Sequence, residues 1–164
     1  MNSDGRSDGA TDGGYDRPWV VTEPGRLVGR GHRAGDVLEA WNWSVVESSP
    51  GLLVVSCHLP EQLKNPKGQL FGGFTATYVD FISIHTVHTL DPDRDPTSAD
   101  HFVSTINMRC DYFEPIMGPT FSVRGELINQ RGLTSLVSTS FLDGDTMMAH
   151  AITTLRRAPE VRQT

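Results

Sequence analysis

The sequence has few cysteines and no cluster of basic residues, and each absence excludes a class of protein. Cys57 and Cys110 are the two cysteines, and they lie far apart without a metal-ligand spacing. We therefore expect neither a disulfide framework nor a zinc site. The net charge is −6 and the pI is about 5.4. This balance argues against a nucleic-acid-binding protein, because such affinity comes mainly from clustered Lys and Arg.

A secretion signal and a clean membrane-spanning run are also missing. The N-terminus has neither a basic start nor an apolar stretch, so the expectation is a cytoplasmic protein without membrane contacts. The length of 164 residues fits one domain. A share of 37% apolar and 21% charged residues is enough for one buried core.

Composition divides the chain into four regions. Residues 1–16 repeat aspartate and glycine around one large apolar side chain, and are predicted to be a disordered tail. Residues 17–35 mix prolines and glycines with a few apolar residues, which predicts an irregular N-terminal arm. The periodic segments all lie within 36–158, the predicted folded domain, and 159–164 form a second tail.

Hydrophobic periodicity predicts a short helix, a hairpin, one long helix and four further strands. The short helix is expected to begin with Asp36 as its N-cap. The predicted strands are 43–46 and 52–59, which flank the turn sequence SSPG, and then 101–113, 120–130, 133–142 and 146–157. Since the last four strands follow one another closely, we expect them to form an antiparallel meander.

Residues 69–90 form the most apolar segment, and Asp80 is its only formally charged side chain. Its many β-branched residues lower helix propensity, and two strands would also suit that composition. We favour a helix, because strands seldom run this long without a turn signal. Such a helix must be covered on most sides. The expected fold is therefore α+β, a curved antiparallel sheet of about six strands wrapped around one long central helix.

Asp80 and the pair Gly72 and Gly73 are the chemically interesting residues of this segment. A buried carboxylate costs several kcal/mol unless it is paired, so Asp80 either lies on a narrow solvent-facing stripe or has a functional role. The glycines either form an ordinary turn or leave helix N–H groups open to a ligand oxygen. A helix separates Gly72 from Asp80 by about 12 Å, so one carbonyl cannot touch both in one subunit. Two antiparallel helices across a twofold interface would bring them together.

The segment NPKGQLFGGFTATYVD at 65–80 resembles the N-x-x-G-x-x-H-G-G-x-x-x-x-x-x-D signature of the PaaI-type hotdog-fold acyl-CoA thioesterases. The matching positions are Asn65, Gly68, Gly72, Gly73 and Asp80. The order of hairpin, helix and four strands from 43 to 157 is similar to the same family. The resemblance implies a hotdog fold and a homodimer or homotetramer. It also implies hydrolysis of acyl-CoA, with coenzyme A as part of the substrate and no other cofactor or metal.

The resemblance also implies a role for each matching residue. Asp80 would activate water or attack the thioester carbonyl, and the backbone N–H of Gly72 would polarise that carbonyl. Asn65 would form hydrogen bonds near the thioester and the loop that carries the helix. In close relatives a serine early in the next strand helps to hold the attacking water, which implies Ser104. Phe71 stands where the family usually has His, and its ring cannot donate the hydrogen bonds of an imidazole.

Further residues are expected to contact the substrate. Phe71 and Gly73 lie at the start of the helix, where Phe71 could line the acyl pocket. The other helix aromatics Phe74, Tyr78 and Phe81 suit a medium-chain or an aryl acyl group equally well. Charged side chains at strand ends could meet the phosphates of coenzyme A, with solvated arginines as the alternative: Arg131, Arg156 and Arg157.

Two other functions fit parts of the pattern. Hotdog domains can also bind acyl-CoA without catalysis, although such sensors usually carry a basic DNA-binding element that is missing here. An enoyl-CoA hydratase would use an Asp and a His five residues apart, as in Asp80 and His85, but the D-x-N-P-x-H motif is absent. His85 and His88 could share a metal, but no third ligand is indicated.

Overall fold

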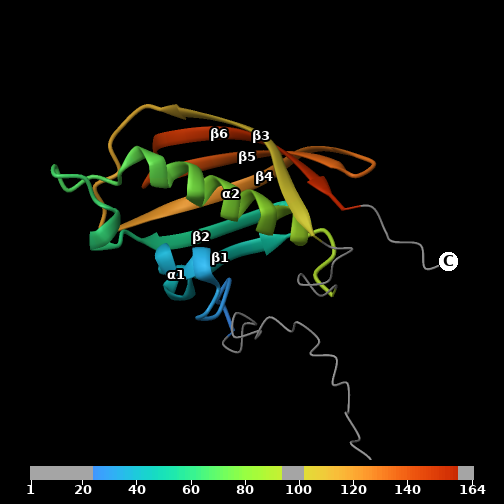
Figure 1. Ribbon diagram of the computed structural model, residues 1–164, viewed down its shortest axis with the longest axis horizontal. Helices are drawn as coiled ribbons and strands as arrows, with labels where there is room; N and C mark the ends of the chain where they lie inside the picture. The colour runs from blue at the N-terminus through green and yellow to red at the C-terminus, as the bar shows by residue number, and fades with distance from the viewer. Residues whose placement is uncertain (1–23, 94–101, 159–164) are drawn as a thin grey trace, which may run out of the picture.

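The computed structural model describes residues 24–93 and 102–158 (Figure 1). Both predicted tails and the first part of the predicted arm lie outside the described residues. The elements run in the order α1 (Arg33–Val37), the 3-10 turn η1 (Ala40–Asn42), β1 (Ser44–Ser49), β2 (Leu52–His58), the 3-10 turn η2 (Glu61–Leu63), α2 (Gly72–His88), β3 (Val103–Tyr112), β4 (Thr120–Arg131), β5 (Thr134–Asp143) and β6 (Thr146–Arg157).

The six described strands form one antiparallel sheet, and α2 lies across one face of it (Figure 1). This arrangement confirms the predicted sheet around one long helix. The strand order is β1-β2-β4-β5-β6-β3. β2 therefore pairs with β4, although η2, α2 and β3 separate them along the chain. The sheet ends in β1 at one edge and in β3 at the other.

The predicted meander of four strands is wrong for its first member. β4, β5 and β6 form a meander, but β3 pairs with β6 and not with β4. Two-residue turns join the three meander strands, and each turn has a glycine at positive φ, Gly132 and Gly144. The seven residues between β3 and β4 include Pro115 and Pro119, which cannot donate ladder hydrogen bonds. This longer segment crosses the end of the sheet instead of folding into a hairpin.

The segment predicted as a helix or as two strands is a helix of 17 residues. Its β-branched residues are tolerated because packing, not propensity, supplies most of its stability. Tyr78, Val79 and Ile82 are fully buried between the helix and the sheet. The ring of Trp43 stacks on that of Tyr78 at 5.1 Å. The aromatic and aliphatic core thus holds α2 in a fixed position over the sheet.

The short N-terminal helix differs from the prediction in its start and its cap. It begins at Arg33, and His32 is the N-cap, because its Nδ1 accepts a hydrogen bond from the N–H of Gly35 at 3.0 Å. Asp36 instead accepts from the N–H of Gly31 at 3.0 Å with both carboxylate oxygens. Its carboxylate therefore closes the preceding loop, and the helix extends into the predicted arm.

Within the described residues, no helix has the length and apolar character needed to cross a membrane.

Candidate active site

The exposed start of α2 offers backbone donors. Gly72 is the first helical residue, and among the described residues no side chain forms a capping hydrogen bond at this end. The first N–H groups of a helix have no acceptor within the helix itself. The approach to the helix is fixed on both sides, since Leu70 donates its N–H to the carbonyl of Ile116 and Phe71 donates to the carbonyl of Leu63. The helix therefore presents its positive end at a well-defined place.

The side chain of Asn65 shapes the loop that leads into α2. Its Oδ1 accepts from the N–H groups of Lys67 at 2.9 Å and of Gln69 at 3.1 Å. Its Nδ2 donates to the side chain of Gln69 at 3.1 Å. Gly68 takes a φ of +76° within this turn, which favours glycine. Asn65 thus occupies the expected place on the loop, and its bonds are made to that loop.

Asp80 lies two turns further along α2, where it is half-buried. Its Oδ1 accepts a hydrogen bond from the hydroxyl of Thr105 on β3. Ser104, the serine that the resemblance implies, does not make this contact. Ser104 is exposed on the opposite face of the strand, and its hydroxyl donates to the carbonyl of Arg156 at 3.4 Å. Alternate strand residues face opposite sides, so Thr105 shares the helix-facing side with the buried Val103.

The aromatic residues of α2 divide into two groups. Phe71 is 56% exposed beside Phe74, with 6.2 Å between the ring centroids. Gly73 is exposed next to the Phe71 ring, which lies 3.1 Å from where a Cβ on Gly73 would be. Tyr78 and Phe81 instead pack in the core against Trp43 and are not available to a substrate. Phe71 and Phe74 are therefore the helix aromatics that could contact an acyl group.

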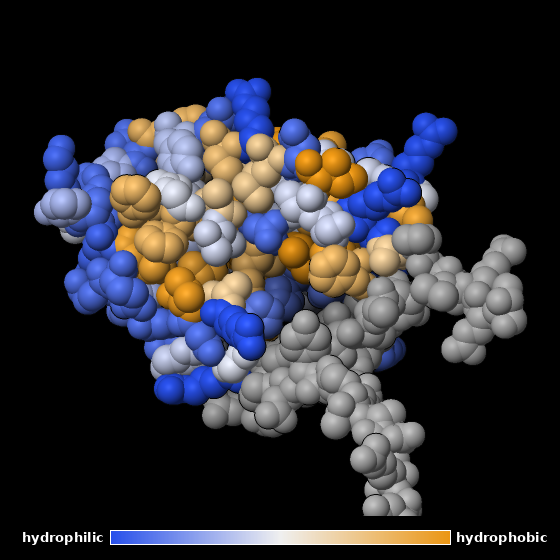
Figure 2. Space-filling model, in the orientation of Figure 1, coloured by the Kyte–Doolittle hydropathy of each residue, from blue (hydrophilic) through white to orange (hydrophobic). Residues whose placement is uncertain are grey.

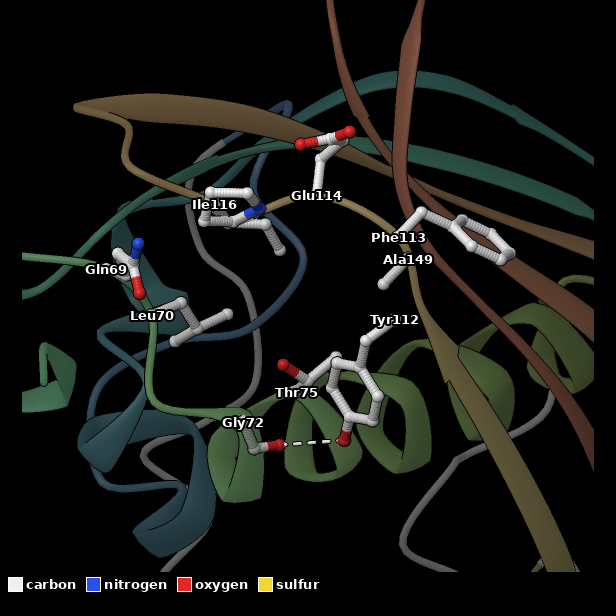
Figure 3. A pocket seen from close by; sticks show the side chains of 10 residues that line it. Gln69, Leu70, Gly72, Thr75, Tyr112, Phe113, Glu114, Ile116 and Ala149 are labelled. Carbon is white, nitrogen blue, oxygen red and sulfur yellow. Dashed lines mark hydrogen bonds between the residues drawn. The ribbon is translucent and has the colours of Figure 1, made fainter.

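A cavity of about 250 Å³ opens at the start of α2. Figure 3 shows the aromatic rings of β3 and the following loop on one side and the approach to α2 on the other. The hydroxyl of Tyr112 donates to the carbonyl of Gly72 at 2.9 Å. The lining residues are Gln69, Leu70, Gly72, Thr75, Tyr112, Phe113, Glu114, Pro115, Ile116 and Ala149. Sequence reasoning missed Tyr112 and this cavity, because no local signal shows which residues the end of β3 meets.

The three arginines lie in the strand register near Thr105, the hydrogen-bond partner of Asp80. Arg131 and Arg156 both lie opposite Thr134 on β5, one on each side, so both face away from α2. Arg157 lies opposite Val103 on the helix-facing side. Thr105 lies opposite Leu155, directly before the two arginines of β6. Arg157 is therefore the one of the three that shares the helix-facing side with Thr105.

The histidines of α2 form a packed group instead of a pair with Asp80. The ring of His85 lies 4.7 Å from that of Phe81 and 5.7 Å from that of His88. Burial, together with smaller contributions from the nearby His88 and His32, lowers the pKa of His85 to about 3. His85 is therefore neutral near pH 7. In the described ranges, no three His, Cys, Asp or Glu side chains come together to hold a metal ion.

Apolar side chains gather on the face of the molecule that carries α2 (Figure 2). β3 forms one edge of the sheet, and large apolar residues on it and beside its ends are more than half exposed: Phe102, Ile106, Tyr112 and Phe113. Exposed apolar patches of this kind often mark interaction sites. An edge strand also presents unpaired backbone groups to which another strand can add.

The chain belongs to the thioesterase superfamily, because the family model of that description matches residues 67–149. This stretch begins just before α2 and includes Asp80, Thr105 and Tyr112. No curated protein sequence matches the chain.

Solved structures of similar fold carry related names. The chain is 12% identical to the PaaI protein of the phenylacetic acid degradation operon of E. coli, over 78% of this chain and 86% of that protein, with a TM-score of 0.64. It is 20% identical to thioesterase superfamily member 2 of zebra fish, over 73% and 83%, with a TM-score of 0.62. It is 18% identical to a hypothetical thioesterase protein of Streptococcus pneumoniae TIGR4 solved with coenzyme A, over 73% and 90%, also with a TM-score of 0.62. At these identities the likeness shows the fold, which is the hotdog fold.

Proposed function

We propose that this protein hydrolyses acyl-CoA thioesters at paired sites of a homodimer. The observation that carries the proposal is the half-buried Asp80 carboxylate, which accepts a hydrogen bond from Thr105 on β3. Asp80 lies on the same helix, α2, that begins with the exposed Gly72 and Gly73. Membership of the thioesterase superfamily supports the reaction class. The Streptococcus pneumoniae neighbour with coenzyme A supports CoA as the carrier of the acyl group.

A second copy of the chain is needed to complete each site. Gly72 and Asp80 lie about 12 Å apart along α2, too far for one carbonyl group to contact both. The bond from Thr105 places Asp80 beside β3, the edge strand of the sheet. A second copy that docks antiparallel along this edge would bring its own Gly72 towards Asp80, giving two equivalent sites. The exposed Phe102 and Ile106 would be covered in the same contact.

The reaction needs one base and one fixed donor at the carbonyl. Asp80 takes a proton from a water molecule, and the water oxygen attacks the thioester carbon. The negative charge that develops on the carbonyl oxygen is stabilised by the N–H of Gly72 from the other copy. The intermediate collapses as the C–S bond breaks. The thiolate of coenzyme A then takes the proton from Asp80, and the free acid leaves. Direct attack by the Asp80 carboxylate is the other route with the same residues.

The remaining site residues would hold the substrate and the loop. Asn65 stabilises the turn before α2, and so fixes where the helix begins. Phe71 and Gly73 lie at the N-terminal end of α2, where Phe71 would contact the acyl group. Arg157 on the helix-facing side of β6, and Arg131 and Arg156 on the outer face, would meet the phosphates of coenzyme A. A cavity of about 250 Å³ favours acyl groups of modest size, including aryl groups, over long chains.

The first test compares wild type with Asp80→Asn in free-thiol release from short, medium, long and aryl acyl-CoAs. The substitution keeps the shape of the side chain and removes the base, so we expect turnover to fall by about a hundredfold or more. Asp111→Asn is the matched control. Asp111 lies on the outer face of β3 in an exposed ion pair with Arg109 at 3.1 Å, and its change should leave turnover unaltered.

Two outcomes would contradict the proposal. Equal turnover in the Asp80→Asn variant would remove Asp80 from the reaction. Wild-type protein that binds acyl-CoA and releases no thiol from any member of the panel would favour a non-catalytic acyl-CoA-binding protein. The feature that favours this second function is Phe71, which stands in place of the usual His.

A further inference from the structure

The two donors at the start of α2 belong to residues with unusual backbone freedom. Gly72 and Gly73 are consecutive glycines, both exposed, and the N-cap residue Phe71 makes no capping hydrogen bond with its side chain. Glycine loses more conformational freedom on ordering than any other residue. A donor that stabilises a developing oxyanion must already point at it, because reorganisation during the reaction reduces the gain. The backbone bonds of Leu70 and Phe71 fix the approach to this turn, and a contact to the glycines themselves would order the two donors further.

Tyr112 makes the contact that can do so. Its hydroxyl donates to the carbonyl of Gly72 at 2.9 Å (Figure 3). Its ring packs over the same residue, 3.7 Å from where a Cβ on Gly72 would be. The carbonyl of Gly72 and the N–H of Gly73 belong to one planar peptide group. A bond to that carbonyl therefore restricts the direction of the Gly73 N–H and the rotation of Gly72 next to it.

We propose that Tyr112 is a positioning residue that orders the donor turn of α2 for catalysis. The proposal rests on the proposed hydrolysis at Gly72 and Asp80 and adds a residue that the family motif at 65–80 does not contain.

The place of Tyr112 in the sheet strengthens this role. Tyr112 is the last residue of β3, and it lies opposite Ala149 on β6. Near the other end of the same strand, Thr105 lies opposite Leu155 and donates to Asp80. β3 thus holds both the base and the donor turn of α2, each through one hydroxyl group. Burial and the neighbouring Cys110 raise the pKa of Tyr112, so its hydroxyl stays protonated and can donate.

Tyr112 also lines the cavity, so a substrate contact must be distinguished from positioning. Tyr112→Phe removes the hydroxyl and keeps the ring, which leaves the cavity wall in place. If the hydroxyl orders the donor turn, kcat should fall about tenfold while KM changes less than about twofold. Tyr78→Phe is the matched control, because the buried Tyr78 hydroxyl has no hydrogen-bond partner in the part of the chain that the structure describes. Its kcat should equal that of wild type.

A second measurement tests the positioning without any turnover. Backbone ¹⁵N relaxation should give lower order parameters for the N–H groups of Gly72 and Gly73 in Tyr112→Phe than in wild type, and unchanged values in Tyr78→Phe. Unchanged order parameters with unchanged kcat would overturn the proposal. A raised KM with unchanged kcat would also overturn it, in favour of a substrate contact. Loss of order in a protein whose wild type releases no thiol would support the positioning of the turn and refute the proposed hydrolysis.

Discussion

At the scale of single residues, the orientation of the Asp80 carboxylate depends on Thr105. Thr105 donates a hydrogen bond to this carboxylate from the edge strand, and the adjacent Ser104 faces the other side of the sheet. A hydrogen bond to a charged group contributes about 1.5–3 kcal/mol. Loss of this bond would leave a half-buried carboxylate free to turn away from the thioester. We therefore expect substitutions of Thr105 and of Ser104 to have different effects on turnover.

We expect Thr105→Val to reduce kcat/KM by about tenfold or more, because the side chain keeps its shape and loses the donor to Asp80. Ser104→Ala is the paired control and should stay within about twofold of wild type, since its hydroxyl contacts only a backbone carbonyl on the outer face among the described residues. Thiol release with a common acyl-CoA measures both. The reverse order of effects would show that Ser104 acts in the reaction and that the contact of Thr105 does not.

At the scale of elements, the short distance between α2 and the sheet depends on a glycine in β4, which has no side chain. Gly125 on β4 lies directly under the helix, and a Cβ there would be 2.0 Å from the Thr86 hydroxyl and 3.0 Å from Ile82. The Thr86 hydroxyl is itself bonded to the carbonyl of Ile82 at 2.8 Å. It cannot move aside without breaking a buried hydrogen bond. The close approach of helix and strand thus requires glycine at this position.

Gly125→Ala should lower the free energy of unfolding by about 2–3 kcal/mol, because an added methyl group in a tight contact forces the helix or the strand to shift. Urea denaturation followed by circular dichroism measures the change. Ser140→Ala on β5 is the control, since Ser140 lies on the outer face of the sheet and its change should stay within about 0.5 kcal/mol. A neutral Gly125→Ala variant would show that α2 packs further from β4 than described.

At the scale of the whole molecule, the proposed site exists only in an assembly. The helix that carries Asp80 cannot place its own Gly72 at the same carbonyl, and β3 offers an apolar sheet edge beside it. The opposite edge, β1, is remote in the strand order and carries its own exposed apolar residue, Val46. The two edges give a direct comparison, because the proposal uses only the edge formed by β3.

Ile106→Glu should give a folded monomer whose turnover is reduced by about a hundredfold or more, since a charge would be buried in the proposed interface. Val46→Glu places the same charge on the β1 edge, where Val46 is 65% exposed, and should leave mass and turnover unchanged. Sedimentation velocity gives the mass, and thiol release gives the turnover. A fully active Ile106→Glu monomer would rule out a site shared between two copies.

The features that depend on local pattern can be predicted from the amino-acid sequence alone. The long apolar run predicted α2 around Asp80, alternating residues and turn signals predicted the strands, and the spacing of Asn65, Gly72 and Asp80 resembled the thioesterase signature. Hydrophobic periodicity and turn chemistry are encoded within a few residues, so these features can be read along the chain. The predicted start of α1 is wrong because His32 caps the helix, while the carboxylate of Asp36 binds the preceding loop.

The features that depend on pairing between distant segments become visible only in the folded chain. β3 lies beside β6 instead of β4, which makes it the edge strand, and the register of that pairing turns Thr105 towards Asp80 and Ser104 away from it. The bond from Tyr112 to Gly72 joins residues that are 40 positions apart. A shift of one residue in strand register exchanges the two faces of a strand. The residues that surround Asp80 and Gly72 therefore follow from packing between elements, which no local pattern in the sequence specifies.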